Sequence, residues 1–451
     1  MGFKENFIWG ASSAAYQIEG AYQDDGKGLN IWDVYTNTKN EPELVKYNET
    51  GNEACDHYHR YKEDIGYMKT LGIKAYRFSI SWTRIFPDGN GELNQKGIKF
   101  YSDIVDELLK NDITPVVTLF HWDYPYELLK RGGWLNPDSS DWFSDFAAVV
   151  VKALSDRVKY WITLNEPQVF IGLGNFAANH APFIKLHNHD IIMASNNVLL
   201  AHGKAVRAIR KNAVTKPVIG ISFASSCCTP YDDSPEEIEA ARKRSFNMNK
   251  NNYPFSVSWW ADPIFLGQYP EEAYKIFGNQ IPEVSKEDMN IISEPVDFYG
   301  LNIYESRSVE RHHGYPESSY IGIGRTTTDW AVTPHTMYWS SKFLYERYNV
   351  SVMITENGMA NTDWVHLDGC VHDPQRIDFT ARYLRELMRA ADDGIDILGY
   401  MHWSVMDNFE WSSGYDKRFG LIYVDYRTQE RIIKDSGYWY SKVIESNGAN
   451  L

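Results

Sequence analysis

The sequence has 451 residues, 43% of them hydrophobic, and a formal net charge of −15. A chain of this length can bury a large core; length alone would suggest about two or three domains, but barrels are an exception to that rule. The acidic balance, without any dense basic run, argues against nucleic acid and anionic membrane surfaces as partners.

Short β-branched and aromatic runs alternate with amphipathic helical patterns along the whole chain. The runs predict strands at residues 7–10, 75–80, 115–120, 161–165, 218–223, 297–304, 352–355 and 398–403. Helical patterns between them include residues 53–71, 141–154, 191–210 and 375–391. This α/β alternation, without a linker or a break in composition, predicts a single (β/α)8 TIM-barrel domain over residues 1–451.

Two segments, residues 227–263 and 306–330, are long for connections within such a barrel. We expect both to be extended βα loops over the active-site face, where a barrel selects its substrate.

The cysteines and the N-terminal residues give information about the cellular compartment of the protein. Cys55, Cys227, Cys228 and Cys370 form neither a disulfide framework nor a CxxC metal pattern. Charged residues interrupt the first seven residues before any apolar run that could serve as a signal peptide, although a processed precursor would have lost its signal. No stretch is apolar enough to span a bilayer, so we expect a cytoplasmic enzyme. The Cys227–Cys228 pair follows the fifth predicted strand and could either pack or face the entrance.

Two predicted strands end in a glutamate, Glu166 within TLNEP at residues 163–167 and Glu356 within ITENG at residues 354–358. Either one alone could be a helix cap or a loop hydrogen-bonding group. A parallel barrel places the carboxyl ends of its strands at one mouth, so both side chains should face the same pocket. Opposed carboxyl groups are what glycosidic cleavage requires, and a covalent sugar intermediate needs them about 5 Å apart.

An arginine in the second predicted strand separates the roles of these glutamates. Arg77 stands where a buried strand would ordinarily carry an aliphatic residue, and a buried guanidinium predicts a carboxylate partner. If that partner is Glu356, the positive charge keeps Glu356 ionised and usable as a nucleophile. Glu166 would then keep its proton longer and act as the acid. The alternative is a structural ion pair elsewhere.

At these residues the chain resembles the β-glucosidases of glycoside hydrolase family 1 along nearly its whole length. The matching pieces are FIWGASSAAYQIEG at residues 7–20, YRFSISW at 76–82, LFHWD at 119–123, TLNEP, ITENG and WSVMDNFEW at 403–411. Each piece is moderately specific, and all of them in this order are very specific.

The resemblance implies that Glu166 is the acid/base and Glu356 the nucleophile, with Arg77, Asn302 and Tyr304 in support. It also implies a sugar site formed by Gln17, His121, Trp122, Asn165, Trp403, Glu410, Trp411 and Phe419. Amide, imidazole and carboxylate groups can bind adjacent ring hydroxyls, and an indole face can cover the C–H side of a pyranose.

The loop after the fourth strand, residues 172–183, departs from the glycine-rich turn of many family members. This leaves the shape of the aglycone side open, and Phe176, Asn179 and Trp330 are candidates for lining it, or for packing or surface roles. The chain keeps Glu410–Trp411, where sugar-6-phosphate hydrolases of this fold carry a Ser and Lys based pocket, and a carboxylate there would repel phosphate. It also keeps Glu166, which thioglucoside-cleaving relatives lack.

We therefore expect a retaining β-glycosidase that acts on small β-glucosides or cello-oligosaccharides without a metal or organic cofactor. A transglycosylating enzyme and a catalytically silent sugar-binding barrel are the alternatives. The preferred sugar, among glucose, galactose and fucose, stays open, and so does the choice between a monomer and a homo-oligomer.

Overall fold

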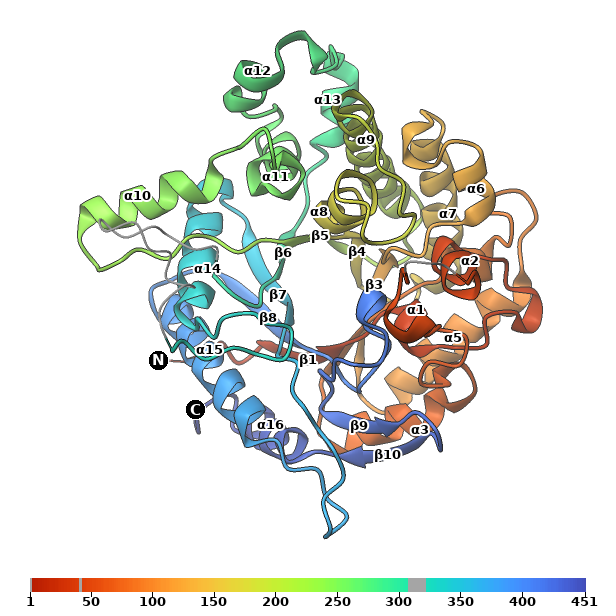
Figure 1. The fold of residues 1–451 in the computed structure, drawn as a ribbon, viewed down its shortest axis with the longest axis vertical. Coiled ribbons are helices and arrows are strands. Elements are labelled where there is room, and N and C mark those ends of the chain that lie inside the picture. Colours follow the sequence, from red (N-terminus) through yellow and green to blue (C-terminus); the bar gives the residue numbers. More distant parts are fainter. Residues whose placement is uncertain (1, 40–42, 307–321) are drawn as a thin grey trace.

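Eight parallel strands pair in chain order and close into a barrel in the computed structural model, which describes residues 2–39, 43–306 and 322–451. The strands are β1 Ile8–Ser12, β2 Ala75–Ser79, β3 Thr114–Phe120, β4 Tyr160–Asn165, β5 Val218–Ala224, β6 Phe298–Asn302, β7 Ser351–Asn357 and β8 Ile397–Trp403. Parallel pairing of β1 with β8 closes the ring, as the view down the barrel shows (Figure 1). The predicted (β/α)8 architecture is confirmed.

Helices surround this barrel on the outside (Figure 1). The longer ones are α3 His57–Thr70, α5 Gln95–Lys110, α7 Ser139–Leu154, α9 Asn188–Asn212, α10 Pro235–Phe246, α14 His335–Tyr348, α15 Pro374–Asp392 and α16 Asp435–Glu445. The shorter ones are α1 Ala15–Ile18, α2 Ile31–Asn37, α4 Trp82–Ile85, α6 Tyr126–Lys130, α8 Pro167–Phe170, α11 Val257–Leu266, α12 Glu271–Phe277 and α13 Lys286–Ile292. In the described parts, none of these helices has the length and apolar character needed to cross a membrane.

The barrel interior is a packed core. One apolar cluster consists only of strand residues, namely Ala75, Val116, Ile162, Phe298, Met353 and Met401. A Cβ atom at Gly220 would lie only 2.3 Å from the ring of Phe298, so glycine leaves the space that this ring fills. Side chains two residues apart on a strand share a face, so Arg77 points into the same interior as Ala75.

Both strands that carry the predicted glutamates are irregular near their carboxyl ends. The pairing of β4 with β5 shifts register between Ile162 and Asn165, and that of β7 with β8 shifts between Ile354 and Asn357. Such irregularities redirect side chains and occur often beside active sites. In this barrel they lie beside Glu166 and Glu356.

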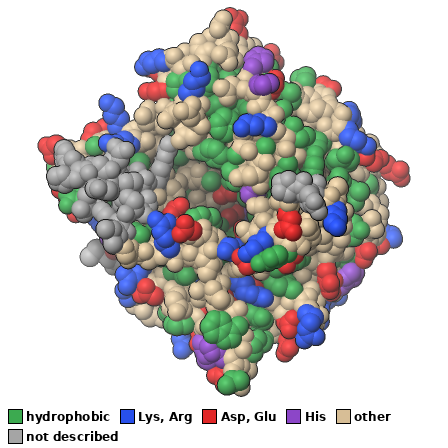
Figure 2. Space-filling view, viewed as in Figure 1, with side chains coloured by type: hydrophobic (Ala, Val, Ile, Leu, Met, Phe, Trp, Pro, Cys, Tyr) green, Lys and Arg blue, Asp and Glu red, His purple; other side chains and the backbone are tan. Residues whose placement is uncertain are grey.

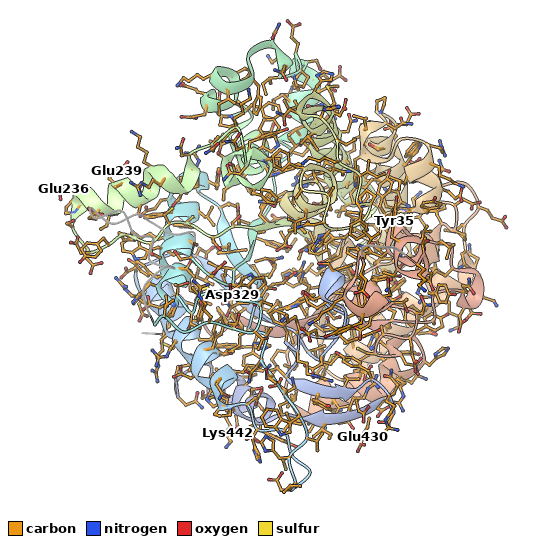
Figure 3. All side chains as sticks on the ribbon, in the orientation of Figure 1. Tyr35, Glu236, Glu239, Asp329, Glu430 and Lys442 are labelled. Carbon is orange, nitrogen blue, oxygen red and sulfur yellow. The ribbon has the colours of Figure 1, made fainter. Side chains whose placement is uncertain are left out.

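Two expectations need correction. The sixth strand ends at Asn302, so residues 303 and 304 belong to the loop that follows it. Residues 227–263 are not simply an extended loop, because they contain α10 and the start of α11. Helix α10 lies at the edge of the molecule, where Glu236 and Glu239 project away from the barrel mouth (Figure 3). Most of the second predicted insertion, residues 307–321, lies outside the described residues.

An antiparallel pair, β9 Ile422–Asp425 and β10 Glu430–Ile433, follows the eighth strand. This pair of strands leads into α16. The four cysteines all lie in the described parts of the chain, and no disulfide links them.

Candidate active site

A cavity of about 290 Å³ lies at the carboxyl ends of the barrel strands. Figure 2 shows this hollow at the centre of the face, with acidic side chains in its depth. Glu166, Glu356 and Glu410 all line it, and so do His121, Trp122, Tyr304, Trp330, Trp403, Trp411 and Phe419. Its lining includes no lysine or arginine among the described residues.

Glu356, near the end of β7, is 4% exposed and held through both carboxylate oxygens. The Nη1 atom of Arg77 donates to Oε1 at 2.6 Å, and the hydroxyl of Tyr304 donates to Oε2 at 2.7 Å. Burial raises the pKa of Glu356, whereas the charge of Arg77 and these hydrogen bonds oppose the rise. Because the guanidinium contacts Glu356 directly, we regard Glu356 as the more readily ionised of the two glutamates.

Glu166 follows β4 directly and is 5% exposed. Its backbone adopts a left-handed conformation with φ of 50°, which a non-glycine residue keeps only where the surroundings enforce it. Its backbone N–H donates to the carbonyl of Ser222 at 2.8 Å, and this bond helps to fix the turn. Burial, followed by the charge of Glu356, raises the pKa of Glu166 to about 8. At neutral pH this carboxyl group therefore retains its proton.

Asn302, the last residue of β6, joins the strands that carry the two glutamates. Its Nδ2 donates to Glu166 Oε1 at 2.9 Å, and its Oδ1 accepts from the Thr355 hydroxyl at 2.6 Å. Asn165 belongs to the same network, since its Oδ1 accepts from Arg77 Nη2 at 2.6 Å and from Asn302 Nδ2 at 3.0 Å. Buried networks of this kind hold side chains rigidly when every member is satisfied.

On the side of the cavity formed by the first and eighth strands, Gln17 and Glu410 meet. Gln17 Nε2 donates to Glu410 Oε2 at 3.2 Å and to Asn408 Oδ1 at 3.0 Å. Burial, followed by the charge of Glu356, raises the pKa of Glu410 to about 8, and the bond from Gln17 opposes that rise. Gln17 Oε1 and His121 Nδ1 are buried without a hydrogen-bond partner in the described structure. Such orphaned polar atoms at a cavity need partners from a bound ligand or solvent.

Aromatic rings form the rest of the wall. The His121 ring lies nearly parallel to those of Trp403 and Trp411, with centroids 5.8 and 6.0 Å away. Trp122 packs on Trp411 at 4.5 Å and donates from Nε1 to the carbonyl of Asn165 at 2.9 Å. Burial, with a smaller effect of Arg77, lowers the pKa of His121 well below its usual range. The imidazole is therefore neutral and offers one donor and one acceptor.

A second cavity of about 540 Å³ adjoins the first, and the two share Tyr304 and Trp330 among their lining residues. Of the residues suggested for the aglycone side, Trp330 is the one that lines these cavities. Phe176 packs instead against Tyr253 and Phe255, with centroids 5.9 and 6.2 Å away. Asn179 is exposed and lines neither cavity.

Several residues that line the first cavity carry no clear signal in the sequence, notably Val169, Leu173 and His180. All three belong to the segment after the fourth strand, which barrel topology already assigns to the active face. His180 is placed by contacts that sequence does not reveal, with ring centroids 5.7 Å from Trp32 and 6.2 Å from Trp122.

The vicinal cysteines do not face the entrance. Cys227 is 0% exposed and Cys228 is 3% exposed. Their backbone N–H groups donate to the hydroxyls of Ser340 and Ser245. Packing is therefore the role that the structure gives them.

A (β/α)8 barrel whose mouth holds two buried glutamates, one paired with arginine, beside amide groups and indole rings has the features of a glycoside hydrolase. A family model described as glycosyl hydrolase family 1 matches residues 1–449, and the chain belongs to this family.

Known proteins support this placement over nearly the full length. The chain is 44% identical to β-glucosidase A of Thermotoga maritima over 99% of its own length and 98% of that protein. A solved structure of the T. maritima β-glucosidase in complex with a substituted glucoimidazole has a TM-score of 0.90 at 43% identity, covering 99% of both chains. An aryl-phospho-β-D-glucosidase of Bacillus subtilis is 37% identical over 100% of this chain and 98% of its own.

Proposed function

We propose that this protein is a retaining β-glucosidase that removes terminal β-D-glucosyl residues by double displacement. The observation that carries the proposal is the difference between the two buried glutamates. Arg77 pairs with Glu356, whereas the pKa of Glu166 is raised to about 8. Two carboxyls whose environments separate their protonation states can divide nucleophilic and acid work between them.

In the first step, the Glu356 carboxylate attacks the anomeric carbon and the bond to the leaving oxygen breaks as Glu166 gives that oxygen its proton. Glu356 is then an uncharged ester. The negative charge that helps to raise the pKa of Glu166 is thereby removed, so Glu166 becomes more acidic and stays ionised. It can then take a proton from the water that releases the sugar and restores Glu356.

Sugar recognition in this proposal uses the orphaned polar atoms around the cavity. Gln17 Oε1 and His121 Nδ1 would bind ring hydroxyls. Glu410 would accept from a further hydroxyl, and the indole of Trp403 would cover an apolar face of the ring. A T. maritima relative crystallised with a glucoimidazole supports a glucose-like occupant.

A 6-phosphorylated sugar is the alternative raised by the phospho-glucosidase relative. The cavity opposes it, because three glutamates and no lysine or arginine are found among its described lining residues. A phosphate would find no lysine or arginine partner among these residues and would be repelled by the Glu356 carboxylate, so we favour a neutral sugar. Cello-oligosaccharides as substrates, a cytoplasmic location and one catalytic domain over the whole chain stay predictions.

The deciding experiment compares wild type with Glu356→Ala on 4-nitrophenyl β-glucoside. We expect kcat to fall by roughly a thousandfold or more, the scale on which loss of a nucleophile affects enzymes. Glu236→Ala, on the exposed surface of α10, is the matched control and should behave as wild type. Azide should restore turnover of Glu356→Ala as an α-glucosyl azide, because it attacks from the side that the carboxylate has left.

The outcomes separate the alternatives. Equal turnover by wild type and Glu356→Ala would refute the nucleophile assignment. No turnover by either protein, while glucose still binds, would support a silent sugar-binding barrel. Disaccharide products at high glucose concentration would reveal transglycosylation.

A further inference from the structure

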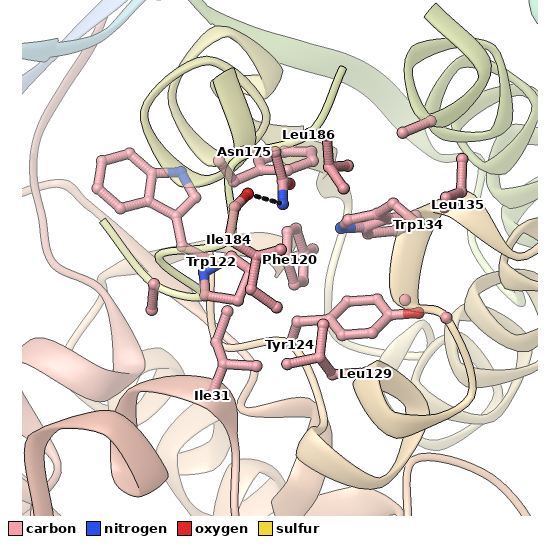
Figure 4. Close-up of a pocket in the computed structure, with 16 residues that line it drawn as sticks. Ile31, Phe120, Trp122, Tyr124, Leu129, Trp134, Leu135, Asn175, Ile184 and Leu186 are labelled. Atoms are coloured by element: carbon pink, nitrogen blue, oxygen red, sulfur yellow. Dashed lines mark hydrogen bonds between the residues drawn. The ribbon is translucent and has the colours of Figure 1, made fainter. Parts of the chain in front are cut away.

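A third, mainly apolar cavity lies next to the sugar cavity and shares Trp122 with it. Its volume is about 250 Å³ (Figure 4). The walls come from the segments after β3 and β4 and from α9, and Ile184, which is 41% exposed, lies among them. A cavity of roughly 150 Å³ already accommodates benzene, so a substituted single ring fits here.

The lining favours a flat, uncharged ligand. No aspartate, glutamate, lysine or arginine is found among its described lining residues. The rings of Phe120 and Phe170 lie 5.5 and 5.7 Å from that of Trp134, and Tyr124 lies 4.9 Å from it. An ion would lose its hydration here without gaining a partner, whereas an aromatic ring would find edges and faces to pack against.

A few polar groups interrupt this apolar wall. Tyr124 is 2% exposed, and its hydroxyl is buried without a hydrogen-bond partner in the described structure. The indole nitrogen of Trp134 faces the interior in Figure 4. Asn175 uses its Nδ2 to hold the carbonyl of Ile184 at 3.3 Å, which fixes the wall. An unpartnered buried hydroxyl beside a cavity calls for a ligand with its own donor or acceptor.

We propose that this cavity is a binding site for neutral single-ring aromatic alcohols and phenols, with the Tyr124 hydroxyl bonded to the hydroxyl of the ligand. The occupant would contact Trp122, whose Nε1 holds the carbonyl of Asn165 in the sugar site at 2.9 Å. Any effect of the occupant on hydrolysis rests on the proposed function, but the binding does not.

The test measures binding of benzyl alcohol to the intact protein by ligand-observed NMR titration, with saturating glucose present to fill the sugar cavity. Ala194→Leu adds a larger side chain to the wall and should abolish binding. Tyr124→Phe removes one hydroxyl that bonds nothing in the described structure, so the fold should be kept. We expect this variant to bind benzyl alcohol about fivefold to tenfold more weakly and toluene unchanged.

Saturable binding of benzyl alcohol in the presence of saturating glucose, with the expected losses in Ala194→Leu and Tyr124→Phe, supports the site. Benzoate, which is charged, should bind more weakly than benzyl alcohol. The proposal is overturned if wild type shows no saturable binding, if glucose displaces benzyl alcohol, or if Tyr124→Phe binds it as wild type does. Should Ala194→Leu fail to fold, the pair of Tyr124→Phe titrations with benzyl alcohol and toluene decides the question. Failure of hydrolysis would leave these titrations unaffected.

Discussion

Arg77 and Glu356 form an ion pair inside the barrel mouth, with Nη1 and Oε1 2.6 Å apart and the arginine completely buried. Arg77 reaches further, because its Nη2 bonds Asn165 and its Nε bonds the hydroxyl of Thr118 at 3.1 Å. The guanidinium therefore sets both the charge of one glutamate and the position of the residue that precedes the other.

The first prediction concerns this charge. Arg77→Met should raise the pKa of Glu356, because burial would then act with less opposition. The proposed mechanism requires ionised Glu356, so the acidic limb of the kcat/KM profile should move to higher pH, and kcat should fall. The exposed Arg385 on α15 provides the control, Arg385→Met, which should keep the wild-type profile. An acidic limb that stays at the wild-type pH in Arg77→Met would contradict the assignment of Glu356 as the nucleophile.

The second prediction concerns the basic limb. In the proposed mechanism Glu166 must carry a proton for the first step, so kcat/KM should decline as pH rises through about 8. Glu166→Gln should lose that limb, and should lower kcat by about 10²- to 10⁴-fold for an alkyl glucoside, whose leaving group needs the proton. With 4-nitrophenyl β-glucoside the first step should suffer much less. Equal losses with both leaving groups would exclude Glu166 as the acid.

The barrel could be predicted because each strand carries its own signal, and every predicted run falls on an observed strand. The run at 297–304 was too long, because Ile303 and Tyr304 are residues that strands favour while the sheet loses its register at Asn302. Helix α10 was missed although Ser234, which caps it through the Glu237 N–H, and Pro235 were visible signals.

The site was predictable where a side chain stands at a strand end and less so elsewhere. Glu166 and Glu356 follow from barrel topology, whereas the loop carrying Phe176 and His180 is positioned by ring packing between distant segments. The cavity behind Trp122 combines residues from Ile31 to Ala194, and no local pattern encodes such a juxtaposition.

The third prediction addresses sugar binding. Gln17→Leu removes the buried Oε1 and the donor to Glu410, so kcat/KM should fall by roughly tenfold to a hundredfold through lost hydrogen bonds. Gln280→Leu changes an exposed residue in the same way and should have no effect. Steady-state kinetics on 4-nitrophenyl β-glucoside measures both, and an unchanged kcat/KM in Gln17→Leu would argue against its contact with substrate.

The fourth prediction concerns stability. Lys434 is completely buried and donates to Asp363 Oδ2 and to Asp407 Oδ1, each at 2.6 Å. Lys434→Met leaves two buried carboxylates short of a partner and should lower the free energy of unfolding by about 3 to 5 kcal/mol. Lys442→Met, on the exposed face of α16 (Figure 3), should change it little. The free energies are measured by urea unfolding, monitored through tryptophan fluorescence. Equal unfolding midpoints for wild type and Lys434→Met would contradict the prediction.

The bond between Gln17 and Glu410 spans 393 positions of the chain. One residue follows the first strand and the other follows the eighth, so the proposed sugar site joins the start of the chain to a segment near its end. During synthesis, a ribosome must release almost the entire polypeptide before these two side chains can meet. A nascent chain therefore lacks the complete proposed sugar site until the barrel can close.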